Sequence, residues 1–316
     1  VATAATVGAV ALPEVRRYGY NERLFLGTLA AGGTLGILIP PSINMIVYAV
    51  LTNTSVPRLY LAGILPGLLL TLFFMGTVVA CCLVRPAWGG AKIASSRGER
   101  FASLRHLLPP LFIFMVVVGS IYAGIATPTE AASLGVVGAL ILAAAFGRLN
   151  WKLLMGSLES TMKSTGMIML IIVGAYFLNF IMASIGLTTQ LTSAIEGLGL
   201  SKYEMLFAVI VFYVVLGCFM ETLSMMITTI PVIAPVMVGL GFDAVWFGIV
   251  VILLIETALI TPPVGLNLFV VQNVRRYGSL NDVIIGAAPF VVALFLMIGL
   301  VTLFPGLALW LPSLWR

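Results

Sequence analysis

Apolar segments long enough to cross a membrane alternate with short polar segments along the chain. Runs of about 20 apolar residues are typical of transmembrane α-helices, so the pattern predicts an all-α integral membrane protein. Two of the longest apolar segments, 24–51 and 246–274, are interrupted near the middle by a Pro-Pro pair. Segment 1–12 is too short to span and is interpreted as the returning arm of a re-entrant hairpin. Segment 205–236 has a polar centre at 221–224 and is interpreted as a re-entrant hairpin. Ordinary spanning helices are expected over 61–84, 107–124, 134–147, 164–185 and 283–304.

The Pro-Pro pairs predict two broken helices. A proline has no N–H and displaces the carbonyl four residues earlier, so Pro40-Pro41 frees the carbonyls of Gly36 and Ile37. Pro262-Pro263 does the same to the carbonyls of Ala258 and Leu259. Inside a membrane such carbonyls must be satisfied by protein, water or a bound cation. Two matched breaks therefore indicate the binding site of a transporter.

The two parts of the chain are predicted to be copies of one another. A shift of 222 residues places Pro40-Pro41 on Pro262-Pro263. The corresponding loops differ in charge, because 13–23 holds three arginines whereas 235–245 holds one aspartate and no base. Basic loops stay on the cytoplasmic side. The copies are therefore expected to have opposite orientations, which is the inverted-topology repeat of many transporters.

This repeat predicts three parts of the chain. Residues 1–84 are expected to be the end of a first repeat that begins before residue 1. Residues 85–106 are expected to be a basic cytoplasmic linker. Residues 107–316 are expected to form the second repeat, with its hairpin at 205–236 and its broken helix at 246–274.

The composition supports a membrane protein and argues against other classes. The 316 residues are 61% hydrophobic and 9% charged, whereas soluble proteins carry about 25% charge. The net charge of +5 lies mostly in short loops, which favours membrane orientation over nucleic-acid binding. The sequence has neither a G-x-S-x-G nor a Walker A motif, and its lone histidine, His106, is expected to be solvated. Neither an enzyme nor an ATP-driven pump is therefore expected.

Three glutamates lie in apolar surroundings, where a carboxylate is costly and a functional role is the default interpretation. Glu221 is the strongest candidate, because it lies at the hairpin tip facing the broken helices. The alternative is a carboxylate that caps a helix N-terminus, and both interpretations also stay open for Glu256. Glu130, in ATPTEAAS, is expected to be structural, in a helix capped by Thr129.

Polar groups beside the breaks suit two kinds of ligand. Ser42 follows the first Pro-Pro pair, where hydroxyls and half-helix N-termini suit an anionic group; a packing serine is the alternative. The carbonyls near Gly36 and Ala258 suit a cation such as Na⁺. The amides of Asn44 and Asn267 occupy matching positions and are candidates to bridge the broken backbone. Further hydroxyls near the breaks are those of Thr34, Thr222, Ser224, Thr257 and Thr261.

Five motifs occur along the chain, from one end to the other: VATAATVGAVALPE, AAGGTLGILIPPSINMI, GIATPTEAAS, FMETLS and ALITPPVG. In these motifs and in their order the chain resembles the large membrane subunit, of DctM/SiaM type, of tripartite ATP-independent periplasmic (TRAP) transporters. The resemblance implies inverted repeats with two re-entrant hairpins and two broken transmembrane helices. It also implies an elevator-type motion like that of the ion transporter superfamily.

The resemblance further implies a secondary transporter of the bacterial inner membrane. A Na⁺ gradient would drive import of an organic acid anion, such as a C4-dicarboxylate or sialic acid. A soluble periplasmic binding protein would deliver the substrate, and a small membrane subunit would accompany the chain or be fused to it. The family's substrate contacts match Ser42 and Glu221, although the family commonly has Asp at the second position. Its Na⁺ sites match Gly36, Ile39 and Pro41 at the first break and Ala258, Thr261 and Pro263 at the second, and Thr222 is a further candidate hydroxyl.

Two other functions fit parts of the pattern. A stand-alone symporter would share this architecture without a binding protein. An ion channel would also use re-entrant hairpins, which line pores. The inverted repeat and the two matched helix breaks argue against a channel.

Overall fold

A computed structural model of the chain describes residues 2–91, 98, 107–186, 190, 199 and 201–314, and every regular element in that part of the chain is helical. Five of these helices are long and apolar enough to cross a membrane, or six if a bent pair counts as one span. The prediction of an all-α integral membrane protein is thereby confirmed. His106, which is expected to be solvated, lies outside the described residues.

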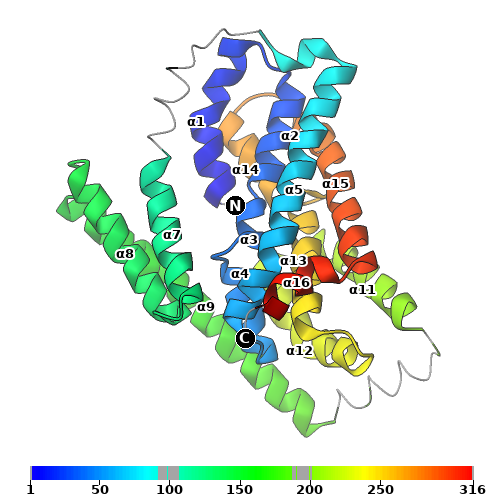
Figure 1. Ribbon diagram of the computed structural model, residues 1–316. Coiled ribbons are helices and arrows are strands. Elements are labelled where there is room, and N and C mark those ends of the chain that lie inside the picture. The colour runs from blue at the N-terminus through cyan, green and yellow to red at the C-terminus, as the bar shows by residue number, and fades with distance from the viewer. Residues whose placement is uncertain are drawn as a thin grey trace. The chain divides into compact units, whose positions relative to one another are not determined.

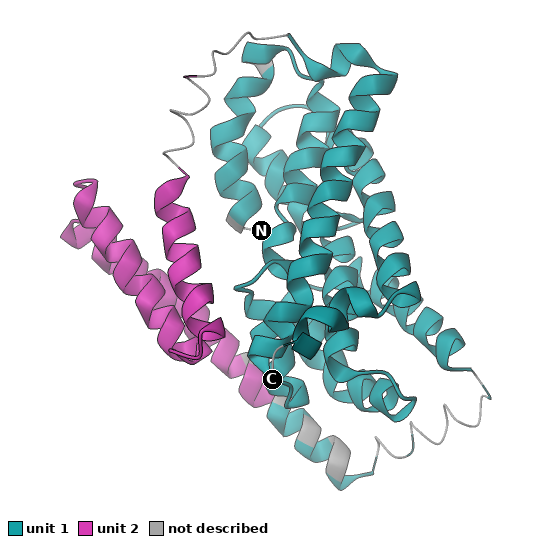
Figure 2. Ribbon diagram, in the orientation of Figure 1, with its two compact units in different colours: residues 1–91, 175–316 teal, residues 92–174 magenta. Residues whose placement is uncertain are grey.

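The chain folds into two compact units, which Figure 2 distinguishes by colour. Unit 1 combines residues 1–91 with 175–316, and unit 2 holds residues 92–174. These units are not the predicted repeats, because unit 1 takes the first 91 residues together with most of the second predicted copy. The repeat boundaries at 85–106 stay a prediction.

Unit 1 holds both broken helices and the helices that pack around them (Figure 1). Its first elements are α1 (Ala2–Tyr18), α2 (Glu22–Gly32), α3 (Leu35–Leu38), α4 (Ile43–Thr52), α5 (Val56–Val84) and the 3₁₀-helix η1 (Pro86–Gly89). Its later elements are α11 (Lys202–Gly217), α12 (Thr222–Gly239), α13 (Ala244–Ile260), α14 (Leu266–Arg275), α15 (Leu280–Leu303) and α16 (Gly306–Leu314).

Both predicted helix breaks are present. The segment predicted as 24–51 consists of α2, α3 and α4, and the pair α2–α3 is bent by 42° relative to α4 across residues 39–42. The segment predicted as 246–274 consists of α13 and α14, with residues 261–265 between them. The peptide bonds Pro40–Pro41 and Pro262–Pro263 are both cis. Each break therefore lies at its Pro-Pro pair, where the N–H groups needed to continue the helix are missing.

The predicted hairpin 205–236 is a pair of helices, α11 and α12, that meet at residues 218–221. α1 is longer than expected, since it passes through Pro13 and ends at Tyr18. The loop predicted over 13–23 is accordingly reduced to residues 19–21. Pro13 costs one helical hydrogen bond but does not end the helix.

Helices α2 and α15 approach closely because two glycines face each other. A Cβ atom on Gly27 would lie 1.9 Å from the carbonyl oxygen of Gly286. A Cβ atom on Gly286 would lie 1.8 Å from the carbonyl oxygen of Arg23. Glycines at such crossings let two backbones pack in contact, a common device in membrane helices. This contact fixes the first half of one broken helix against the last spanning helix.

Unit 2 contains α7 (Leu108–Tyr122), α8 (Pro128–Ala145) and most of α9 (Trp151–Ser184). α9 is a single helix of 34 residues, and it begins 13 residues before the predicted span 164–185. α8 begins six residues before the predicted 134, at Pro128, because proline suits the first helical position. The sequence suggested Thr129 as the N-cap of this helix, but the N-cap is Thr127. Thr127 and Glu130 form a reciprocal capping box. The structural role expected for Glu130 is confirmed.

Candidate functional site

The first helix break is seated against α5. Leu38 is fully buried, and its carbonyl lies 2.6 Å from where a Cβ atom on Gly63 would be. The side chain of Ile39 lies 2.8 Å from the corresponding position on Gly67. Two small residues on α5 therefore make room for the unwound backbone, as is typical of close packing between membrane helices.

Ser42 organises the far side of this break. It is 2% exposed and is the N-cap of α4. Its hydroxyl donates to the carbonyl of Ile37 and accepts a 3.5 Å hydrogen bond from the amide of Met45. The expectation that Pro40 and Pro41 leave two free carbonyls is therefore corrected for one of them, because the hydroxyl of Ser42 bonds to the carbonyl of Ile37. Gly36, the other residue of that expectation, is exposed.

The start of α1 lies at the same break. The hydroxyl oxygen of Thr3 is 3.8 Å from where a Cβ atom on Gly36 would be, and Ala4 lies 2.6 Å from the corresponding position on Gly33. Sequence reasoning did not include Thr3 among the candidates. Its place in the first of the five motifs, VATAAT, is the signal that would have identified it.

The second break is contacted by the hairpin tip. A Cβ atom on Gly217 would lie 2.2 Å from the Cβ of Ala258. The sulfur of Cys218 lies 3.2 Å from the carbonyl oxygen of Val214 and 3.3 Å from that of Pro262, and its one proton can be donated to either. Thr261 donates its hydroxyl proton to the carbonyl of Thr257 at 2.7 Å, which leaves its oxygen lone pairs available. Cys218 is thus a contact between the tip and the break.

The carboxylate of Glu221 is the N-cap of α12. It accepts hydrogen bonds of 3.0 and 3.1 Å from the amides of Leu223 and Ser224. The hydroxyls of Thr222 and Ser224 also donate to it, at 2.8 and 3.4 Å. The capping alternative considered for Glu221 is therefore present in the structure, and the hydroxyl proton of Thr222 is committed to it. Glu221 remains exposed, so its role toward a substrate stays a prediction.

Helix packing brings the predicted site residues into two groups. α12 packs on α4, so the helices that Glu221 and Ser42 cap are direct neighbours. α1 packs on α14, and α13 packs on both α3 and α4. Gly36, Ile39 and Pro41 lie at the first break. Ala258, Thr261 and Pro263 lie at the second break, beside the tip that carries Thr222.

The amides of Asn44 and Asn267 do not bridge their own breaks. Asn267 is fully buried and donates a 3.1 Å hydrogen bond to the carbonyl of Ala30 in α2. Asn44 is 7% exposed, and its amide nitrogen has no hydrogen-bond partner among the described residues. Asn267 thus connects the second broken helix to the first.

An ion-pair cluster lies where α2, α14 and α15 meet. Arg275 is buried and donates to Glu22 at 2.9 Å and to Asp282 at 3.3 Å, and Arg23 donates to Asp282 at 2.8 Å. The hydrogen bond from Arg23 and those from Arg275 hold the pKa of Asp282 below its usual value. Burial works to raise the pKa of Glu22, but hydrogen bonds with Tyr277 and Arg275 outweigh it and the pKa is lowered. Both carboxylates are therefore stabilised in their charged form.

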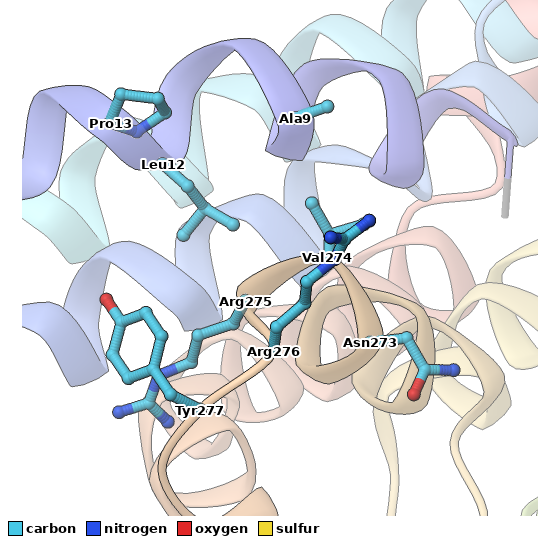
Figure 3. A pocket seen from close by; sticks show the side chains of 8 residues that line it. All are labelled: Ala9, Leu12, Pro13, Asn273, Val274, Arg275, Arg276 and Tyr277. Atoms are coloured by element: carbon cyan, nitrogen blue, oxygen red, sulfur yellow. The ribbon is translucent and has the colours of Figure 1, made fainter.

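A pocket of about 570 Å³ opens beside this cluster, between α1 and the end of α14 (Figure 3). Arg275 lies over the ring of Tyr277, 4.9 Å from its centre. The lining residues are Ala9, Leu12, Pro13, Asn273, Val274, Arg275, Arg276 and Tyr277. None of the predicted site residues lines this pocket, so it is distinct from the two breaks.

Comparison with known proteins decides the family. The sequence model of the DctM component of the tripartite ATP-independent periplasmic transporters matches residues 1–307. The chain belongs to this family. It is therefore a TRAP transporter large permease and not an enzyme.

Curated relatives agree with this assignment. The chain is 35% identical over 313 residues to the C4-dicarboxylate TRAP transporter large permease protein of Pseudomonas aeruginosa, covering 99% of the chain and 73% of that protein. It is 30% identical to the sialic acid TRAP transporter large permease of Vibrio cholerae, with 99% and 73% covered. It is 32% identical to the ectoine TRAP transporter large permease of Halomonas elongata, with the same coverage. The chain is thus a multi-pass membrane protein of a secondary transport family.

Proposed function

We propose that this TRAP permease imports an organic acid anion across a bacterial inner membrane, driven by a Na⁺ gradient. A periplasmic binding protein delivers the substrate, and a small membrane subunit completes the transporter. The tripartite family description supports both partners. The relatives named for C4-dicarboxylates and for sialic acid support an organic acid as the substrate.

The observation that carries the proposal is the pair of helix breaks, each in contact with a hairpin arm or tip. Thr3 and Ala4 lie at the first break, and Gly217 and Cys218 lie at the second. Broken helices that place half-helix ends at one locus are how many transporters bind substrate and coupling ion. We propose that the hairpins and broken helices move together, in an elevator-type motion.

Na⁺ is the coupling ion in this proposal and is carried with the substrate. The carbonyls of Gly36, Ile39 and Pro41 form the first cation position. The carbonyls of Ala258, Thr261 and Pro263, with the hydroxyl of Thr222, form the second. Exposure of Gly36, Pro41 and Pro263 supports access, and unwound carbonyls are typical Na⁺ ligands in transporters.

The substrate docks beside Ser42 and Glu221. These residues cap α4 and α12, two helices that pack on each other. The N-terminus of α4 carries partial positive charge, which favours the anionic group of an acid, whereas at α12 the carboxylate of Glu221 already offsets that charge. The carboxylate of Glu221 acts by ordering the hairpin tip that it caps, next to the substrate. Ser42 provides a hydroxyl group at the break.

Uptake by proteoliposomes containing the complete transporter tests this proposal. Labelled C4-dicarboxylates and sialic acid are offered with or without a Na⁺ gradient, and with or without the binding protein. Uptake that requires both supports the proposal. Uptake driven by a proton gradient overturns the sodium coupling, and uptake without a binding protein favours a stand-alone symporter. Passive conductance without saturation favours a channel.

Ser42→Ala tests the substrate site, and Ser55→Ala is its control, because Ser55 is a second N-cap serine in the same unit. Ser42→Ala is expected to abolish uptake, and Ser55→Ala to leave it close to wild type. Equal uptake by both variants contradicts the substrate role of Ser42.

A further inference from the structure

Glu256 is a carboxylate without ordinary partners inside unit 1. It is fully buried in α13, and neither of its oxygens has a hydrogen-bond partner within the described residues. Glu130 and Glu221, the other two acids in apolar surroundings, are both occupied as caps. Native proteins rarely leave a buried polar group unsatisfied, and such groups call for a functional explanation.

The polar group that Glu256 faces belongs to the other broken helix. α13, which carries Glu256, packs on α3, and the backbone of Leu38 at the end of α3 favours the charged form of the carboxylate. The carboxylate forms no hydrogen bond with it. Leu38 immediately precedes Ile39 and the first Pro-Pro pair. A carboxylate from the second broken helix is therefore directed at the backbone of the first break.

The two repeats differ at this position. A shift of 222 residues places Glu256 on Thr34. Thr34 is also fully buried, but its hydroxyl donates a 2.8 Å hydrogen bond to the carbonyl of Ala31. The negative charge is thus found on one copy alone, and it lies across from the break of the other copy.

An ionised carboxylate in a buried apolar setting is strongly destabilising unless another charge compensates it. The Leu38 backbone, which forms no hydrogen bond with the carboxylate, compensates only part of that charge. The carboxylate therefore favours a cation at the adjacent break.

We propose that Glu256 is the fixed countercharge for the cation at the first break, formed by the carbonyls of Gly36, Ile39 and Pro41. It is a positioning residue that acts through the cation and the Leu38 backbone, and it connects the second broken helix to the cation position of the first. This inference rests on the proposed Na⁺ coupling.

The test compares Glu256→Gln with Thr302→Val in the complete transporter. Gln keeps the volume and an acceptor oxygen but removes the charge. Thr302 is the control, because it lies in α15, a helix that packs on α13, and its hydroxyl donates to the Ile298 carbonyl of its own helix at 2.8 Å. The melting temperature in detergent is measured in NaCl and in choline chloride, and the Na⁺ concentration for half-maximal uptake is measured in proteoliposomes.

Glu256→Gln is expected to melt no lower than wild type in choline, because it lacks the uncompensated charge. Its stabilisation by Na⁺ is expected to shrink, and the half-maximal Na⁺ concentration to rise about tenfold, or about 1.4 kcal/mol of binding free energy. Thr302→Val is expected to keep the wild-type response to Na⁺.

Three results overturn the inference while leaving Na⁺ coupling intact. They are a wild-type Na⁺ response of Glu256→Gln, an equal loss of its stability in both salts, and failure of the variant to fold. A wild-type transporter whose melting and uptake ignore Na⁺ overturns the proposed coupling, and the inference with it.

Discussion

The side-chain amide of Asn267 donates a 3.1 Å hydrogen bond to the carbonyl of Ala30, a residue 237 positions earlier in the chain. Ala30 belongs to the last turn of α2, and the amide of Thr34, which would continue the helical pattern, bonds to Ala31 instead. The last carbonyls of a helix have no partner within the helix. Asn267 therefore caps the first broken helix from the start of α14.

Asn267→Ala is expected to destabilise the permease by about 1–2 kcal/mol, because the buried carbonyl of Ala30 loses its donor. Asn273→Ala is the control, since Asn273 is an exposed residue of the same helix. The measurement is unfolding in detergent with increasing denaturant. Equal midpoints for the two variants contradict a capping role for Asn267.

Gly286→Ala is expected to separate α2 from α15, because its Cβ atom would lie 1.8 Å from the carbonyl of Arg23. Overpacking of this kind costs about 1–3 kcal/mol or more. Gly299→Ala in the same helix meets nothing within 4 Å and is expected to be neutral or slightly stabilising. The yield of folded protein and its melting temperature check both expectations. A folded Gly286→Ala protein with unchanged stability would show that the two helices do not pack this closely.

Arg275→Met is expected to lower stability at neutral pH by about 1–3 kcal/mol, because Glu22 and Asp282 lose a buried cation. The adjacent Arg276 is exposed and has no ion pair within the described residues, so Arg276→Met is the control. Melting temperatures at pH 7 compare the two variants. A larger loss for Arg276→Met would contradict the importance of the cluster.

The same cluster predicts a dependence on pH. Because the folded-state pKa values of Asp282 and Glu22 are lowered, their contribution to stability is complete above their unfolded pKa values of about 3.9 and 4.3. It is lost as the pH falls through the lower, folded-state values. Wild type is therefore expected to lose stability more steeply than Arg275→Met below about pH 4. Parallel melting curves for the two proteins from pH 6 to pH 3 rule out this linkage.

Substitutions of Glu221 distinguish a role of its side chain in capping α12 from a role of its negative charge. Asn caps a helix as well as Asp does but carries no charge, and the hydrogen bonds of Glu221 described above all lie within its own hairpin tip. We expect Glu221→Ala to abolish uptake and Glu221→Asn to retain a substantial part of it. Uptake assays in proteoliposomes measure the difference. An equal loss in both variants would mean that the carboxylate acts directly on substrate or ion.

Local covalent chemistry explains what sequence reasoning located correctly. Proline lacks an N–H wherever it occurs, so Pro40-Pro41 and Pro262-Pro263 broke their helices as expected. The apolar runs likewise became helices, because a bilayer leaves the backbone no other way to satisfy its polar groups. The ends of helices were predicted less accurately. α1 continues through Pro13, and the N-cap of α8 is Thr127.

Partners across the fold were not readable from the chain, because they depend on packing between segments far apart in sequence. Hydropathy marked Glu256 as costly, yet only the approach of α3 to α13 placed it opposite Leu38. The same holds for Asn267, whose amide was expected at its own break and instead reaches Ala30. The sequence by itself determined the membrane helices, the two breaks and the family motifs, since these follow from local composition. Tertiary structure decided which groups compensate the broken backbone, since a hydrogen bond or charge acts only on what lies within a few ångströms of it.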